Sequence, residues 1–151
     1  MKNNILAIVV TLFAGMILTA GSQSPQFSLR MHVEAGDQTR DERVIPVGLV
    51  DPDEIVRVHK IPVLTEKMLL NAVSTPDGGV LLGLNQAGKH SLETVTRTEM
   101  GKTLVVIING RVLYAADIDM PMSSGKFLIP NGLDEADLTL MQSYLEQRQR
   151  Y

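Results

Sequence analysis

Cysteine and tryptophan are absent from this chain of 151 residues, and aromatic side chains are limited to three phenylalanines and three tyrosines. The lack of cysteine excludes disulfide bonds, zinc sites built from thiolates, and cysteine nucleophiles. The scarcity of aromatic rings argues against a site that binds nucleobases or sugars by stacking.

A strong excess of one charge is also absent. The chain has 14 basic and 17 acidic residues, for a net charge of −3. Residues 1–22 hold one lysine and no acid, so the remainder carries 13 basic and 17 acidic residues, or −4. A weakly acidic chain is a poor partner for nucleic acid or for an anionic membrane surface. We expect neither as a main partner, and we expect membrane contact only through an uncleaved N-terminus.

The N-terminus holds the longest apolar run. Lys2 precedes an apolar run from Ile5 to Ala20, about sixteen residues, whereas a membrane-spanning helix needs ~20. This pattern predicts a secretory signal peptide or N-terminal anchor over residues 1–22. The sequence before Ser22 resembles the start of a lipoprotein cleavage box, but Ser22 stands where that box needs cysteine. We therefore expect an exported protein without a lipid at this position.

The first half of the remaining chain shows short strand patterns broken by turn residues. Residues 27–34 alternate, with Phe27, Leu29, Met31 and Val33 on the apolar side, and predict a half-buried strand. Residues 35–43 read as a polar loop, and prolines make residues 44–53 extended and irregular. A strand is expected at 55–58. A short helix should begin after the N-cap Thr65, with Met68, Leu69 and Ala72 on its apolar face. A turn at 76–79 and a strand at 80–84 should follow.

The second half carries stronger local signals. Asn85 is expected to cap a helix with Gly88, Leu92, Val95 and Met100 along its buried face, which should stop at Gly101. The β-branched run at 104–108, the Asn109-Gly110 turn, the strand beginning at Val112 and a third strand at 127–129 predict a three-stranded meander. Asp134 should cap a last helix with Glu135 and Asp137 at its start and Arg148 and Arg150 at its end. Its buried stripe is expected to comprise Ala136, Leu140, Met141, Tyr144 and Leu145. The predicted fold class is α+β, a mostly antiparallel sheet with helices packed on one face.

The region from Val80 to Ile129 resembles the head subdomain of the first periplasmic domain of the SecD/SecF protein-export family. The matching pieces fall in register without a gap: Leu84-Asn85, Gly88, Leu92, Val95-Thr96-Arg97, Met100-Gly101-Lys102, Leu104, Asn109-Gly110, Val112-Leu113, Ala115, Pro121 and Gly125. Three positions depart from the family pattern, namely Lys89, Ala116 and Ser124. The resemblance implies an α+β domain at 47–151, preceded by a strand and polar linker at 23–46. Because that family's head subdomain is thought to act on emerging polypeptide during export, it also implies a polypeptide or envelope-protein partner.

Candidate catalytic and metal sites have simpler interpretations. His32, His59 and His90 lack the spacing of metal ligands, and we expect surface histidines. Met120 and Met122 could bind Cu(I), although methionine also fills gaps in cores. The acid pairs Asp51/Asp53 and Asp117/Asp119 could serve a glycosidase, but a solvent-facing strand shows the same spacing. No Gly-x-Ser-x-Gly elbow and no phosphate-binding loop occur in the sequence.

The sequence thus predicts an exported, non-enzymatic protein of the cell envelope that binds a polypeptide or an envelope protein and needs no cofactor. No catalytic, cofactor-binding or metal-binding residue is assigned. The alternative is a small periplasmic copper carrier or envelope enzyme, which would need a concave site with convergent polar groups.

Overall fold

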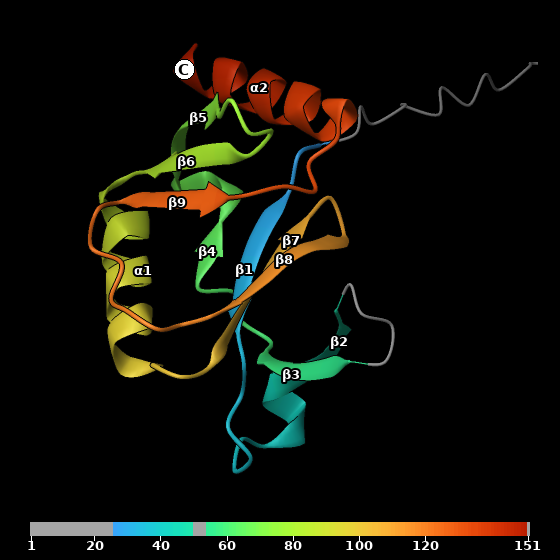
Figure 1. Cartoon of the computed structure of the whole chain (residues 1–151), viewed down its shortest axis with the longest axis vertical. Coiled ribbons are helices and arrows are strands. Elements are labelled where there is room, and N and C mark those ends of the chain that lie inside the picture. Colours follow the sequence, from blue (N-terminus) through green and yellow to red (C-terminus); the bar gives the residue numbers. More distant parts are fainter. Residues whose placement is uncertain (1–25, 50–53, 151) are drawn as a thin grey trace, which may run out of the picture.

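The computed structural model describes residues 26–49 and 54–150 (Figure 1). The predicted signal peptide and the pair Asp51/Asp53 lie outside these residues. The elements are, in chain order, β1 (Leu29–Val33), the 3-10 helix η1 (Asp41–Arg43), β2 (Val44–Gly48), β3 (Ile55–His59), β4 (Leu64–Thr65), the 3-10 helix η2 (Glu66–Met68), β5 (Leu69–Ser74), β6 (Val80–Leu84), α1 (Gln86–Thr98), β7 (Thr103–Ile108), β8 (Arg111–Asp117), β9 (Lys126–Ile129) and α2 (Glu135–Gln149).

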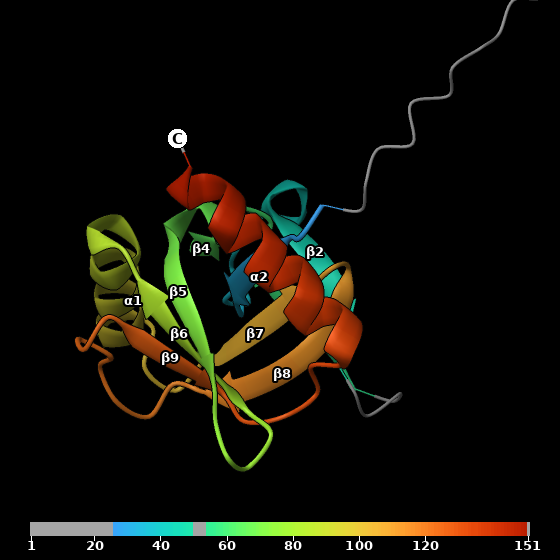
Figure 2. The ribbon, with the colours of Figure 1, turned by 90° about the horizontal axis from the view of Figure 1, so that it is seen from above.

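Two antiparallel sheets share one hydrophobic core, with the helices beside them (Figure 2). The four-stranded sheet has the order β4-β1-β7-β8, and the three-stranded sheet has the order β5-β6-β9. Alternate side chains of both sheets point into the core, as they must when successive residues face opposite sides of a strand. The alternation predicted for β1 is confirmed, because Leu29, Met31 and Val33 are all buried. The fold is α+β, as the sequence predicts.

The second face of the four-stranded sheet is covered as well, which the sequence did not predict. The β2–β3 hairpin places Val47, Val56 and Val58 against Val105 of β7. His32 pairs in register with Val105, so the two side chains share this covered face. The expectation of a surface His32 is therefore wrong: the residue is 3% exposed. Its Nδ1 lies 2.8 Å from the carbonyl oxygen of His59, and because a carbonyl only accepts, this nitrogen carries the proton.

The predicted helix after Thr65 is wrong. Only the single turn η2 forms, and Thr65 makes no side-chain cap. The chain then continues as β5, which pairs with β6 in a hairpin whose loop carries the predicted turn at 76–79. Strand pairing with β6 outweighs the weak helical spacing of the apolar residues in this segment.

The segment from 44 to 48 is also more regular than the sequence suggested. It forms β2, with Pro46 opposite Arg57. The proline is tolerated because β2 has one strand neighbour among the described residues, and an edge strand can spare a donor. The predicted strand at 55–58 is confirmed as β3.

Helix α1 begins where the local signals predict, but its last residue is Thr98, two residues before Met100. The Asn85 side chain accepts a hydrogen bond from the Gly88 backbone nitrogen at 2.9 Å. A Cβ at Gly88 would lie 2.9 Å from the Met68 Cβ, so glycine allows close packing here. Gly101, with φ +80°, follows the helix. Met100 was expected on the buried face but lies beyond the last helical residue and is exposed.

Helix α2 is capped by Asp134, whose carboxylate accepts a hydrogen bond from the Asp137 backbone nitrogen at 2.8 Å. Met141 and Leu145 are buried as predicted, but Ala136 is exposed and Asp137 is buried instead. The buried face is rotated because Asp137 has polar partners on the β7–β8 hairpin, described below. Neither α1 nor α2 has the length and apolar character needed to cross a membrane.

The β7–β8 hairpin is confirmed, with φ of 49° at Asn109 and 80° at Gly110, the positive values that a type I′ turn needs. The predicted meander is wrong at its third strand. β9 pairs with β6, with Phe127 opposite Leu82 and Ile129 opposite Val80. This pairing buries Phe127 and Ile129 in the common core, and it leaves β8 and β9 unpaired with each other.

Candidate functional site

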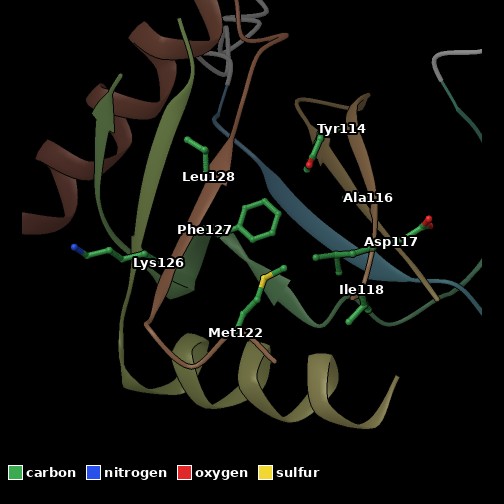
Figure 3. A pocket seen from close by; sticks show the side chains of 9 residues that line it. Tyr114, Ala116, Asp117, Ile118, Met122, Lys126, Phe127 and Leu128 are labelled. Carbon is green, nitrogen blue, oxygen red and sulfur yellow. The ribbon is translucent and has the colours of Figure 1, made fainter. Parts of the chain in front are cut away.

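The strands β8 and β9 each end a sheet, and they face each other across the molecule (Figure 3). Each has one strand partner among the described residues, so each presents an edge without a second strand. At the opposite ends of both sheets, helices contact the outermost strands, although most of β5 stays exposed. α2 packs against β5, where the Arg148 guanidinium donates to the Leu69 carbonyl oxygen at 2.7 Å. α1 packs against β4, and the Ser91 hydroxyl donates to the Val63 carbonyl oxygen at 2.5 Å.

A cavity of about 160 Å³ lies between these two strands, and we call it the β8–β9 groove. Its walls come from both sheets and from the connecting loop, residues 118–125. The lining residues are Leu104 of β7, Tyr114, Ala116 and Asp117 of β8, Ile118 and Met122 of the loop, and Lys126, Phe127 and Leu128 of β9.

The walls of the groove are mainly apolar. The rings of Tyr114 and Phe127 lie with their centroids 6.4 Å apart in an edge-to-face arrangement that joins the two strands across the groove. Met122 is half-buried and packs on the core, and a thioether chain can adapt its shape to a guest. Ala116, one of the three departures from the family pattern, contributes only a methyl group and so leaves space.

Opposite charges lie on the two strands at the rim. Asp117 of β8 and Lys126 of β9 are both exposed. The Asp117 carboxylate has one weak partner, the Thr103 hydroxyl at 3.5 Å. Figure 3 shows their charged ends pointing away from the cavity on opposite sides, and exposed charges are well screened by water, so these two groups add little affinity.

The loop beneath the groove is attached to α1 and β6. The Met122 backbone nitrogen donates to the Thr96 hydroxyl at 2.8 Å. Gly125 is buried with φ +71° and packs against the aliphatic stem of Lys89, and its carbonyl oxygen accepts from the Leu84 backbone nitrogen at 2.9 Å. These contacts fix where the loop runs and hence where β9 begins.

Comparison with known protein families identifies the family of this chain. The family model of the SecDF P1 head subdomain matches residues 20–141, most of the chain. The chain belongs to this family. The match extends the resemblance seen over residues 80–129 in both directions, and it includes β1 and the first half of α2.

Solved structures of SecDF share the fold. One, described as "Structure and function of a membrane component SecDF that enhances protein export", is 20% identical over 78% of this chain and 62% of that chain, with a TM-score of 0.56. Another, described as "Crystal structure of SecDF in Super-membrane-facing form", is 21% identical over 78% of this chain and 18% of that chain, with a TM-score of 0.51. This chain therefore spans less than two thirds of the length of either structure. A search among curated proteins found no match.

The candidate residues predicted from the sequence lie apart in this P1 head fold. Met122 lines the groove, whereas Met120 is 59% exposed. Asp117 ends β8 and Asp119 lies in the loop, so they do not share a strand face as predicted. His90 is exposed, as expected, and His59 is half-buried. Residues 26–49 and 54–150 contain no group of three histidine or acidic side chains arranged to hold a metal ion.

Sequence reasoning missed the aromatic pair Tyr114 and Phe127 as site residues. Both were placed on strands, but the predicted meander would have paired those strands and closed the groove. It also missed a polar cluster at the far end of the β7–β8 hairpin. There the buried Asp137 carboxylate accepts from the Asn109 side chain at 2.8 Å and from Arg111, whose guanidinium also lies 3.2 Å from Asp134.

Proposed function

We propose that the protein binds an extended segment of polypeptide in the β8–β9 groove by strand addition, as an exported, non-enzymatic protein of the cell envelope. The observation that carries the proposal is the pair of facing edge strands with an apolar cavity between them. An edge strand offers backbone donors and acceptors to an added strand, and pockets beside it select alternate side chains.

The size of the cavity favours a side chain over a free small molecule. Drug-sized ligands occupy pockets of roughly 300–1,000 Å³, and the groove measures about 160 Å³. A strand presents every second side chain to the same face. The groove would therefore hold one apolar side chain of the bound segment, and backbone hydrogen bonds to β8 or β9 would supply much of the remaining affinity.

Family membership supports a polypeptide as the occupant. The SecDF structure that shares this fold is described as a membrane component that enhances protein export. A binding site for extended chain is what a protein acting on exported polypeptide needs. The location in the periplasm or outside the cell rests on the predicted signal peptide at residues 1–22.

The complex should be weak. A single added strand buries less surface than the ~1,200 Å² at the lower end of stable protein interfaces. Its affinity should depend little on salt, because the groove is apolar and its two rim charges are exposed.

Filling the groove tests the proposal. Ala116→Phe adds a ring inside the cavity, and we expect at least a tenfold loss of affinity for a fluorescent peptide of alternating apolar and polar residues. Ala136→Phe is the matched control, because Ala136 is exposed on α2 and does not line the groove. Fluorescence anisotropy measures both affinities, and thermal melts confirm that both variants fold.

Equal binding by the Ala116 and Ala136 variants would contradict the assignment of the groove. A parallel titration with Cu(I) addresses the alternative of a metal carrier. Stoichiometric copper uptake that is lost when Met120 and Met122 are replaced by leucine would favour the carrier over the polypeptide-binding protein.

A further inference from the structure

The unpaired state of β8 and β9 needs a physical cause. The two strands are consecutive in the chain and run in opposite directions across the groove, with Asp117 and Lys126 at one end and Tyr114 and Leu128 toward the other (Figure 3). Consecutive strands that run in this way usually pair with each other. Here they are kept apart, and the loop of residues 118–125 that joins them lies against α1.

Thr96 makes the central contact between that loop and the helix. Its side chain is fully buried, at 0% exposed. The hydroxyl donates to the Leu92 carbonyl oxygen at 2.7 Å within α1 and accepts from the Met122 backbone nitrogen at 2.8 Å. The hydroxyl thus uses its proton within the helix and one of its two lone pairs for the loop, so the loop is joined to the helix through its own backbone.

The helix-internal bond alone would be unremarkable in a helix, because threonine often bonds to the carbonyl four residues earlier. Thr98 does so with Thr94 at 3.0 Å and lies exposed on the same helix. The bond that Thr96 accepts from Met122 is what distinguishes it. It fixes the backbone of the residue whose side chain lines the groove.

We propose that Thr96 is a positioning residue that holds the 118–125 loop against α1 and thereby keeps the β8–β9 groove open. Met122 is then placed in the groove wall from the helix side, and the start of β9 is directed toward β6. Without the acceptor at Thr96, the Met122 N–H in this part-buried position must find another partner, and the loop leaves the helix. The consequence for peptide affinity rests on the proposed function, whereas the consequence for groove width does not.

The absence of cysteine allows a direct measurement of groove width. Asp117→Cys and Lys126→Cys place one label on each exposed rim position, and pulsed electron paramagnetic resonance gives the distance distribution between two attached spin labels. We expect a narrow distribution with Thr96 present and a broadened or shifted one in Thr96→Val, which has the same shape without the hydroxyl. Thr96→Ser should restore the narrow distribution. Thr98→Val makes the same chemical change on the same helix and should leave it unaltered.

Two further readouts, made on chains without labels, separate the possible outcomes. In Thr96→Val, amide exchange at Met122 should accelerate at least tenfold while exchange at Val106 in β7 stays unchanged, which shows that the sheet remains folded. Affinity for the alternating peptide should fall about tenfold, as expected for loss of one buried hydrogen bond.

An unaltered label distance together with unaltered Met122 exchange overturns the positioning role, whatever the affinity for the peptide. An altered distance in a protein that binds no peptide supports the positioning role and refutes the proposed function instead.

Discussion

Replacing Asp137 by alanine should destabilise the protein far more than any other change in the first turn of α2. The residue is 4% exposed, and its carboxylate accepts hydrogen bonds from Asn109 and Arg111. Asn109 also makes two hydrogen bonds with Ser28. Its backbone nitrogen donates to the Ser28 carbonyl oxygen at 3.0 Å, and its Oδ1 accepts from the Ser28 backbone nitrogen at 2.9 Å. Asp137 therefore joins α2 to the tip of the β7–β8 hairpin and, through Asn109, to the residue before β1.

The magnitude follows from the two partners. A hydrogen bond to a charged group contributes about 1.5–3 kcal/mol, and a buried donor left unsatisfied adds a desolvation cost. Arg111 loses less, because its side chain is 52% exposed and keeps Asp134 at 3.2 Å. We expect Asp137→Ala to lower the free energy of unfolding by about 2–4 kcal/mol. Asp137→Asn keeps an acceptor for Asn109 and should cost about half as much.

Urea denaturation at neutral pH measures these differences. Glu135→Ala is the control, since Glu135 lies in the same turn but is exposed, and such changes usually stay within about 0.5 kcal/mol. If Asp137→Ala and Glu135→Ala lowered stability equally, the buried carboxylate would not be what fixes α2, and the assignment of this cluster would fail.

Stability measurements on further variants test other parts of the structure, and an intact-mass measurement tests the predicted signal peptide. Gly110→Val should cost roughly 1–3 kcal/mol in a denaturant melt, because valine is strained at φ 80°, and a neutral result would contradict the type I′ turn. Leu92→Ala should cost ~2–5 kcal/mol by the same assay, since Leu92 is fully buried, whereas His90→Ala should stay within ~0.5 kcal/mol; a larger effect at His90 would mean that the face of α1 is misassigned. Intact mass after expression in a bacterial host should show a chain that begins near Gly21 or Gln23, and a soluble cytoplasmic product beginning at Met1 would argue against export.

The elements predicted correctly are those that depend on neighbouring residues. Asn85 and Asp134 cap helices because their side chains accept from the backbone nitrogen three residues ahead, and Asn109-Gly110 turns because both residues tolerate positive φ. These signals are complete within a few residues of sequence. They fix where α1, α2 and the β7–β8 hairpin begin and end.

Apart from Met100 at the end of α1, the main errors concern contacts between distant segments. The sequence predicts a helix over β5 because the pairing with β6 is not visible in the spacing of this segment, and it predicts a surface position for His32 because the cover over that residue comes from β2 and β3. The sequence does not predict the β8–β9 groove, for the same reason. A meander would have paired β8 with β9, whereas the actual partner of β9 is β6, which precedes it by more than one element.

The facing edges of β8 and β9 have a consequence for stoichiometry. Ordinary strand addition at a single edge creates a fresh edge, so the sheet can go on growing, and this is how many proteins aggregate. A segment that pairs with β8 has its new edge toward β9, and a segment that pairs with β9 has its new edge toward β8, because the two strands face each other across the groove. At the other ends of the sheets, α2 contacts β5 and α1 contacts β4, although most of β5 stays exposed. If the proposed function holds, the facing strand would limit growth of the sheet at this site to one added segment, so an unfolded chain could be held here without seeding a fibre.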